Sequence, residues 1–235
     1  MDRVRFIFSE AVGRLKKSLK RHVLTEEIYR LLKDQLMNHA IAPGEKINID
    51  QLSRELEVSN IPIREALSRL ASEGFVHTVP FKGMFAAQMS RGELDDIYEI
   101  RKELERLAIR KAAPRIPAPR LTELERNMRT WYGLRPADGD GKIRLIGEMN
   151  RGLHGLILEY CGNETLKKLI SMYIEKIQRY LSYVGPDLDQ GVIEKEGQEH
   201  MRIAASLSSG RFEAAERDLL EHLDRSHART RAFFS

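Results

Sequence analysis

Residues 59–70 (SNIPIREALSRL) constrain the fold more than any other stretch, because they predict a short helix with defined ends. Ser59 is expected to be its N-cap, with the hydroxyl accepting a bond from an amide of the first turn. Pro62 falls within that turn, where a missing N–H costs nothing. Gly74 then stops the helix at its C-terminal end.

The two faces of this helix differ in chemistry. The predicted buried face is an apolar stripe of Ala66, Leu67 and Leu70. The other face carries Asn60, Ile61, Arg64 and Ser68. Such a face, next to the positive end of the helix dipole, suits a DNA groove. The stretch alone fits an ordinary surface helix equally well.

Two further helices are predicted before this one. Thr25 is expected to cap the first of them. Asn48 and Gln51 have the spacing of a capping box for the second, which ends at Glu57. Only a few residues separate that end from Ser59, so a tight turn joins two short helices.

A β-hairpin is predicted directly after the third helix. Residues 75–79 alternate like a strand, residues 80–83 (PFKG) form a turn, and residues 84–87 return as a second strand. Three helices followed by a hairpin with a basic tip indicate a winged helix-turn-helix. In that arrangement the second helix of the pair lies in the major groove, and the wing touches the DNA backbone or the minor groove.

From residue 90 onward every long segment has a helical pattern. Ser90 and Glu93 form a capping box for a helix that runs to Ala113. Its predicted inner face is Leu94, Ile97, Ile100, Leu104, Leu107 and Ala108. Further helices are expected near residues 120–131, 142–160, 163–183, 190–208 and 211–231. Six helices without a strand indicate a bundle.

The predicted fold is therefore mainly α and has three parts. A basic extension covers residues 1–24, a winged helix-turn-helix covers residues 25–89, and an all-helical bundle covers residues 90–235. The extension has seven basic and two acidic side chains. A basic arm can follow DNA phosphates. A solvated tail, or a short helix over residues 9–21 packed elsewhere, explains the same pattern.

Composition narrows the class of protein. With 42% apolar and 31% charged residues, the chain is typical of a soluble globular protein. We expect no membrane span, since no apolar run approaches the ~20 residues that one needs. A single cysteine, Cys161, excludes an intramolecular disulfide framework and suits a reducing cytoplasm.

Residues 42–46 (APGEK), 59–67 (SNIPIREAL) and 73–76 (EGFV) resemble the DNA-binding signature of GntR-family transcription regulators. Residues 93–101 (ELDDIYEIR), with Leu104 and Glu105 after them, resemble the start of the helical effector domain of the FadR-like subgroup, known as FCD. This resemblance implies a cytoplasmic homodimer that acts as a repressor or an activator on a double-stranded DNA operator. It also implies that the helical domain senses a small molecule, often a carboxylic acid metabolite.

The resemblance places DNA-contacting positions at Ser59, Asn60, Ile61 and Arg64, with the wing tip at Lys82 and Gly83. Arg64 suits a bidentate contact to guanine. Ser59 and the amides beside it suit a phosphate. Family members commonly carry Arg where this chain has Asn60, and Asn favours adenine, so the operator is expected to differ. A dimer of such helices is expected to bind a pseudo-palindrome.

Three histidines stand out in the helical half. His200 and His222 lie on apolar stripes, and His154 lies four residues after Asn150 on one helical face. All three are predicted to face inward, where an unpaired polar group is costly. They form either a metal site or a set of imidazoles that neighbouring groups satisfy.

The resemblance favours metal, because metal-binding FCD members use an Asp-x-x-x-His pair and two later histidines. The corresponding set here is Asn150, His154, His200 and His222, in which Asn150 is a neutral and therefore weaker ligand than Asp. Histidines suit Zn²⁺ or Ni²⁺ better than Mg²⁺ or Ca²⁺. The same four residues and Arg101 are predicted to surround the effector. Arg101 either pairs with its carboxylate or forms a structural ion pair with a nearby Glu.

Two other functions fit parts of the pattern. One is a metal-dependent hydrolase on a helical bundle, but the chain has no His-Glu-x-x-His motif and no glycine loop for phosphates. The other is a DNA-binding module whose bundle only dimerises. Catalytic residues are not predicted.

Overall fold

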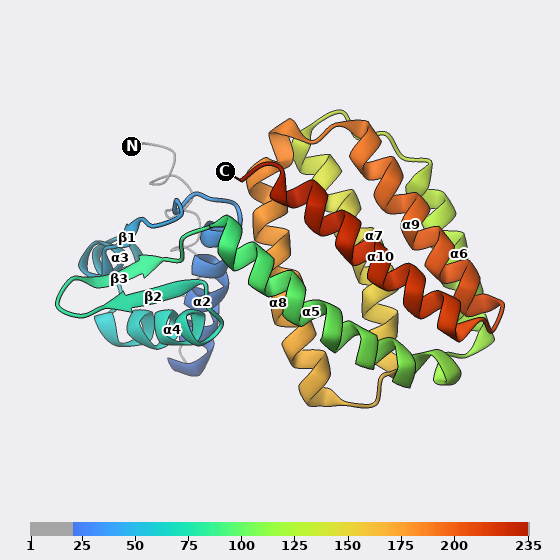
Figure 1. The fold of residues 1–235 in the computed structure, drawn as a ribbon. Coiled ribbons are helices and arrows are strands. Elements are labelled where there is room, and N and C mark those ends of the chain that lie inside the picture. Colours follow the sequence, from blue (N-terminus) through green and yellow to red (C-terminus); the bar gives the residue numbers. More distant parts are fainter. Residues whose placement is uncertain (1–20, 235) are drawn as a thin grey trace. The chain divides into compact units, whose positions relative to one another are not determined.

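The computed structural model describes residues 21–234, so residues 1–20 of the predicted basic extension, and with them most of its predicted helix, lie outside the described part. The chain forms two compact units, Met1–Met89 and Ser90–Ser235 (Figure 1). No helix in the described range is long and apolar enough to cross a membrane.

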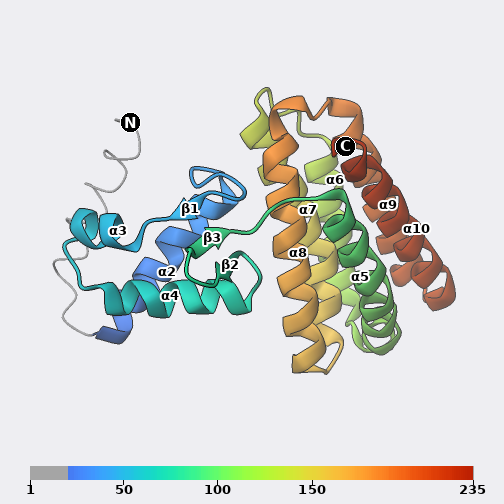
Figure 2. The same cartoon turned by 60° about the vertical axis from the view of Figure 1, so that its left-hand side comes forward.

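The first unit is a winged helix-turn-helix (Figure 2). Its elements are α2 (Arg21–Met37), β1 (Lys46–Ile47), α3 (Ile49–Leu56), α4 (Asn60–Ser72), β2 (Val76–Val79) and β3 (Gly83–Ala86). The strands form an antiparallel sheet in the order β1-β3-β2, in which Thr78 pairs with Met84 and Lys46 pairs with Phe85. The predicted hairpin is present, and β1 adds a third strand that the sequence did not predict.

One apolar core holds the helices and the sheet of this unit together. Ile63, Leu67 and Leu70 of α4 are fully buried and belong to the same core as Ile28 of α2 and Leu56 of α3. Burying one such side chain contributes about 1.5–3 kcal/mol. This packing fixes the rotation of α4 about its axis, so the opposite face must point away from the core.

The ends of the helices follow the predictions with two exceptions. Asn48 caps α3 through the amide of Gln51, and Gly74 has a positive φ of 78° just after α4. Ser59 is the N-cap of α4, but its side chain makes no capping bond. The usual partner would be the third amide of the helix, and that residue is Pro62, which has no N–H.

The second exception concerns the first helix. Thr25 was predicted to cap it, yet α2 already begins at Arg21 and Thr25 lies inside the helix. The Thr25 hydroxyl donates instead to Glu65 of α4, at 3.1 Å. The Thr25 hydroxyl, which the sequence pattern predicted to cap a helix, therefore bonds to a distant residue on α4 instead.

The second unit is a bundle of helices. Its elements are α5 (Arg91–Ala112), η1 (Ala113–Arg115), α6 (Ala118–Tyr132), α7 (Gly139–Tyr160), α8 (Glu164–Val184), η2 (Gly185–Asp187), α9 (Gln190–Ser208) and α10 (Phe212–Arg231). Helix α9 packs against α10 and α6, and α5 packs against α7, α8 and α10. Ser90 caps α5 through the amide of Glu93, as predicted.

The inner face of α5 differs from the predicted one. Ile100 and Leu107 are 44% and 46% exposed, whereas Tyr98, Arg101 and Glu105 are buried. The apolar residues of α5 span a wider arc than its neighbours cover. Part of that arc therefore stays at the surface of the unit, and polar residues share the interior.

Candidate DNA-binding surface and histidine centre

The start of α4 presents the predicted DNA-contacting residues to solvent. Ser59 is exposed in an extended conformation, with φ −69° and ψ 162°, and its hydroxyl makes no cap. Ile61 is 54% exposed although it is apolar. Arg64 is exposed, and no hydrogen bond or ion pair joins it to any part of the chain that the structure describes. These side chains are available to a partner outside the unit.

Asn60 differs from its neighbours because another side chain holds it. Its amide nitrogen donates to Asp50 Oδ1 of α3, at 2.8 Å. A bidentate contact to adenine needs both the amide nitrogen and the amide oxygen of an Asn. Asn60 must therefore release Asp50 before it can read adenine in that way. The two residues are ten apart, on different helices, so no local sequence signal marks the pair.

The wing lies at the tip of the β2–β3 hairpin. Lys82 and Gly83 are exposed there, as predicted. Lys46 of the unpredicted strand β1 lies beside them, because its Cε is 3.6 Å from the position that a Cβ on Gly83 would take. Phe81 is fully exposed and has a positive φ of 62°. Lys46 and Phe81 thus join the surface without having been predicted.

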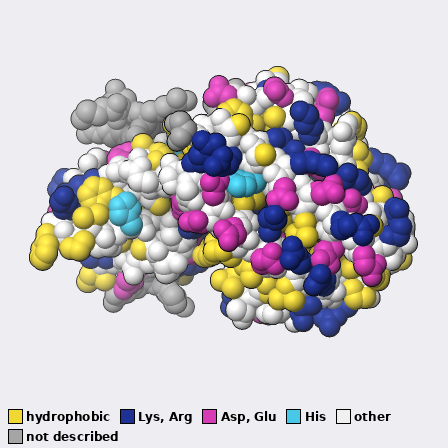
Figure 3. All heavy atoms as spheres, viewed as in Figure 1, with side chains coloured by type: hydrophobic (Ala, Val, Ile, Leu, Met, Phe, Trp, Pro, Cys, Tyr) yellow, Lys and Arg dark blue, Asp and Glu magenta, His cyan; other side chains and the backbone are white. Residues whose placement is uncertain are grey.

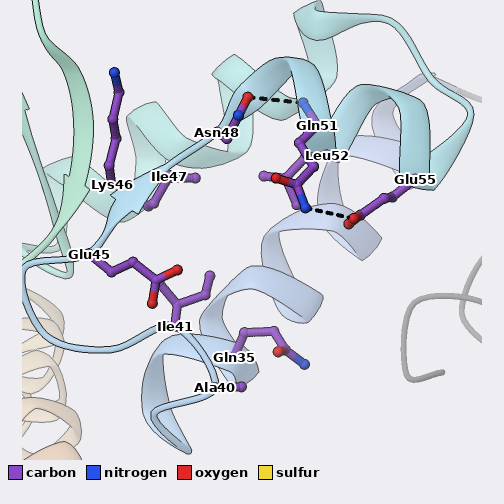
Figure 4. Close-up of a pocket in the computed structure, with 10 residues that line it drawn as sticks. All are labelled: Gln35, Ala40, Ile41, Glu45, Lys46, Ile47, Asn48, Gln51, Leu52 and Glu55. Atoms are coloured by element: carbon purple, nitrogen blue, oxygen red, sulfur yellow. Dashed lines mark hydrogen bonds between the residues drawn. The ribbon is translucent and has the colours of Figure 1, made fainter. Parts of the chain in front are cut away.

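A small hollow lies on the same unit, next to β1 and α3 (Figure 4). It measures about 120 Å³, whereas metabolite pockets usually measure about 300–1,000 Å³. Its lining has two carboxylates, Glu45 and Glu55, against one cation, Lys46, so its net charge disfavours an acidic effector. We therefore do not assign an effector to this unit.

The three predicted histidines meet inside the helical unit. His154 of α7, His200 of α9 and His222 of α10 are each at most 1% exposed. One ring nitrogen from each lies within 4.8 Å of the others. The Nε2 atoms of His200 and His222 are 3.1 Å apart. We call these three residues the histidine centre.

Two buried carboxylates orient the imidazoles. Glu105 Oε2 of α5 accepts from His154 Nδ1 at 2.5 Å, and Glu199 Oε2 of α9 accepts from His222 Nδ1 at 2.9 Å. These carboxylates occupy the Nδ1 side of both rings. His154 Nε2 then has no partner in the described range, and His222 Nε2 lies against His200 Nε2. A carboxylate behind a histidine is the usual outer shell of a metal site.

The charges around the centre are set by its neighbours. Burial would raise the pKa of Glu105, but Arg101 and His154 outweigh it and hold that pKa at about 2. Burial likewise opposes ionisation of Glu199, while His222 and Arg229 hold its pKa at about 2. Burial lowers the pKa of His154 and of His200. These two imidazoles are therefore neutral near pH 7, which is the form that binds a metal.

Two ring nitrogens of the centre remain without a partner. His154 Nε2 and His200 Nδ1 are buried, and neither has a hydrogen bond within the described range. A buried polar atom without a partner is costly unless something else satisfies it. Three buried imidazoles, two of them with a carboxylate behind them, match the ligand set of Zn²⁺ or Ni²⁺. The residues present therefore fit a divalent metal.

A second group of possible ligands, Glu196, Glu199 and His222, does not fit as well. Arg229 Nη2 already lies 2.5 Å from Glu196 and 2.7 Å from Glu199, so a guanidinium occupies the space between the carboxylates. Burial would lower the pKa of Arg229, but Glu199 and Glu196 together raise it. This group is an ion-pair network that supports the histidine centre.

Asn150 and Arg101, the other two predicted site residues, have different surroundings. Asn150 is partly buried one turn before His154 and has no hydrogen bond among the residues described. Arg101 is buried, and its Nε pairs with Glu105. The structure thus contains the ion pair that was one of the two alternatives for Arg101. Its role toward an effector stays a prediction.

An open cavity of about 470 Å³ lies on the surface formed by α9 and α10. It is lined by Lys195, Gln198, Glu199, Arg202, Arg225 and Arg229. Its volume falls in the usual range for a small ligand, about 300–1,000 Å³. Because Glu199 lines the cavity and also accepts from His222, one carboxylate connects this surface with the histidine centre.

Comparisons with known proteins agree with both halves of this description. Residues 24–85 match the bacterial regulatory proteins of the gntR family, and residues 96–225 match the FCD domain. The chain is 29% identical to the HTH-type transcriptional regulator YdhC of Bacillus subtilis, over 84% of this chain and 87% of that protein. It is 30% identical to the Nta operon transcriptional regulator of Aminobacter aminovorans, over 80% and 86%. The structure of Escherichia coli McbR/YncC is similar with a TM-score of 0.71 at 23% identity, covering 91% of this chain and 98% of the other.

Proposed function

The chain belongs to the GntR family and is a DNA-binding transcription regulator with an FCD domain; on this premise we propose that it is a homodimeric repressor controlled by a small carboxylate. The carboxylate binds in the helical unit, at the histidine centre. Its binding changes the affinity of the dimer for a pseudo-palindromic operator. The relatives are regulators of transcription, so the hydrolase alternative gains no support from them.

On the DNA side, Arg64 reads a base edge and Ser59 binds a phosphate. The support is their exposure at the start of α4, together with the absence of any partner for Arg64 in the described range. Lys82 and Gly83 contact the backbone from the wing. One recognition helix reads only a few base pairs, so two copies are needed for a specific site.

The dimer uses the exposed apolar flank of α5. Ile100 and Leu107 on α5 and Leu169 on α8 are each at least 40% exposed. Apolar side chains gather where α5 and α8 run next to each other (Figure 3). A contiguous apolar surface of this kind is typical of an interface between protein chains. A second copy of the chain would cover it.

On the sensing side, the observation that carries the proposal is the pair of buried, unpartnered nitrogens of His154 and His200. His154, His200 and His222 would hold a Zn²⁺ or Ni²⁺ ion, with Asn150 as a weak fourth ligand. Such an ion, when bound, supplies a Lewis-acidic position for a carboxylate oxygen. Glu105 and Glu199 hold the Nδ1 side of His154 and His222, so these two imidazoles would bind the ion through Nε2.

The coupling to DNA follows from differential affinity. A ligand can shift the equilibrium between two arrangements of the dimer only by the difference in its affinity for them. The effector is bound by residues from α7, α9 and α10, so it ties three helices together. If the arrangement that binds the effector more tightly binds the operator more weakly, the effector would relieve repression.

Metal analysis of the purified full chain, combined with a thermal-shift screen of small organic acids, tests the proposal. We expect metal in wild type, none in His200→Ala, and stabilisation by a carboxylate only where metal is present. Operator release by the same acid would support repression. A metal-free wild type that no organic acid stabilises would remove the sensing role and leave a bundle that only dimerises.

A further inference from the structure

The tip of the wing carries an aromatic side chain that the unit does not bury. Phe81 is fully exposed, whereas Phe75, at the start of the same segment, is 1% exposed in the core. Figure 3 shows apolar side chains at the end of the β2–β3 hairpin, with a basic side chain near them. The exposure of Phe81 brings no hydrophobic stabilisation to this unit.

The backbone at Phe81 is also unfavourable for a bulky residue. Its φ is 62°, in the left-handed region that Gly or Asn normally occupies in a tight turn. The next residue but one, Gly83, also has a positive φ, of 107°. A glycine at position 81 would relieve the backbone without loss of packing. The turn needs this φ, because the Lys82 amide donates to the Val79 carbonyl across it at 3.1 Å, but it does not need a bulky side chain there. Strained residues of this kind cluster at functional positions.

The surroundings of Phe81 are basic. Lys82 follows it in the chain and is exposed, and Lys46 of β1 reaches Gly83 from the neighbouring strand. The hairpin itself packs against α4 through β2, within the same compact unit. An apolar tip close to two cations, on the unit that carries the recognition helix, is complementary to a groove bordered by phosphates.

We propose that Phe81 is an apolar wedge that enters the minor groove of bound DNA and partly unstacks one base step. Lys82 and Lys46 contact the phosphates on either side. Apolar side chains inserted in this way kink the duplex, and the kink lets it wrap more protein surface. The operator should therefore have a flexible pyrimidine–purine step under the wing. This inference rests on the DNA-binding function of the unit.

Two other partners for Phe81 are less compatible with the structure. A stable interface between two chains buries about 1,200–2,000 Å², and one side chain at the end of a narrow hairpin offers little of that area. A lipid surface would select a larger apolar area with more cations around it. Both remain outcomes of the test.

The test compares Phe81→Gly with Phe81→Leu in the full-length protein. The DNA probe is the duplex that wild type retains from a random-sequence library, labelled at both ends for energy transfer and carrying 2-aminopurine at its pyrimidine–purine steps. For Phe81→Gly we expect affinity to fall about tenfold or more, with loss of both the bend and the 2-aminopurine signal. Phe81→Leu keeps a wedge and should retain most of the bend.

Stability is measured on the same variants by amide hydrogen exchange over residues 76–86. In Phe81→Gly the exchange should be no faster, and up to about fivefold slower, because the strained φ is relieved. Weaker DNA binding from a hairpin that is not less stable separates the wedge from a folding defect. Lys82→Gln is the matched control, and it should lower affinity and the salt dependence while the bend is kept.

Several results would overturn the proposal. A Phe81→Gly protein that binds and bends DNA like wild type removes the wedge. So does a loss of affinity without any change in bend. Loss of dimers or of vesicle binding in Phe81→Gly, with DNA binding intact, assigns Phe81 to another partner. If wild type retains no duplex at all, both the wedge and the proposed operator binding fail. If wild type retains a duplex that Arg64→Ala does not bind, operator binding through α4 holds, and the Phe81 variants decide the wedge alone.

Discussion

The two units place their polar residues in opposite ways. Among the residues described, the winged helix-turn-helix buries one polar side chain, Gln35, and leaves most of the residues predicted to contact DNA exposed. The helical unit buries a whole network of charged and imidazole side chains around the histidine centre. A surface that meets DNA can stay hydrated until it binds. Polar groups in the interior of a bundle must instead be satisfied by one another or by a bound ligand.

This difference predicts which substitutions destabilise the protein and which only weaken its binding. In the helical unit, removal of one charge leaves its partner buried without a counter-charge. In the DNA-binding unit, the partner of an exposed charge stays accessible to water when that charge is removed.

Arg101→Leu should give the largest loss of stability. It leaves Glu105 buried and ionised without its cation, and breaking such a pair costs about 3–5 kcal/mol. Trp131, the only tryptophan in the chain, lies in α6, so its fluorescence in urea reports unfolding of the helical unit. The matched control is Arg64→Leu, which should change stability by no more than about 0.5 kcal/mol.

The double variant Arg101→Leu with Glu105→Leu sharpens this result. Replacing both partners by apolar residues should recover part of the lost stability, because no buried charge is left alone. Recovery is incomplete because His154 Nδ1 loses its acceptor. An Arg101→Leu protein as stable as wild type would mean that Glu105 is not held as a buried charge. The contrast between the two units would then fail.

The next largest effect should be on metal affinity, when residues next to the histidine centre are replaced. Glu199→Gln weakens the carboxylate behind His222, and loss of an outer-shell partner typically costs about 10–100-fold in metal affinity. Asn150→Asp should act in the opposite direction, because an anionic oxygen replaces a neutral one. Calorimetry on chelator-stripped protein measures both. Equal affinities in both variants and wild type would place any metal elsewhere.

Local signals in the sequence predicted most of the fold. The capping bonds of Asn48 and Ser90 span three residues, so the sequence displays them directly. The sequence also predicted that His154, His200 and His222 meet, because each lies on an apolar stripe and must face inward. Strand β1 has only two residues and no periodicity to detect.

Long-range partners could not be predicted in the same way. Glu105 lies 49 residues from His154, and Asp50 takes the amide of Asn60 across two helices. The pattern of α5 even placed Ile100 inside and said nothing of Glu105 as a buried group. Charged residues on a helix suggest solvent, and only the tertiary structure shows which of them are paired in the interior.

Arg64→Ala should affect DNA alone. Loss of a bidentate contact to guanine costs about 1–3 kcal/mol of binding and relaxes selection at one base pair. Selection from a random library and titration of the preferred duplex measure the two effects separately. Lys82→Ala is the comparison, because a phosphate contact should weaken all sequences alike. An unchanged footprint with Arg64→Ala would remove α4 from the groove.

The smallest expected effect concerns Asp50, the residue that holds Asn60. Asp50→Ala frees the Asn60 amide for adenine and removes a negative charge from the DNA-facing side. Since a hydrogen bond contributes a net of about 0.5–1.5 kcal/mol, we expect binding to tighten by no more than that, with a stronger preference for adenine. Asp50→Asn keeps an oxygen acceptor without the charge, so it separates the two causes. If Asp50→Ala instead binds more weakly and loses its preference at that base, Asp50 positions Asn60 for the groove. The DNA-binding surface would then resemble the helical unit, in which side chains hold one another in position.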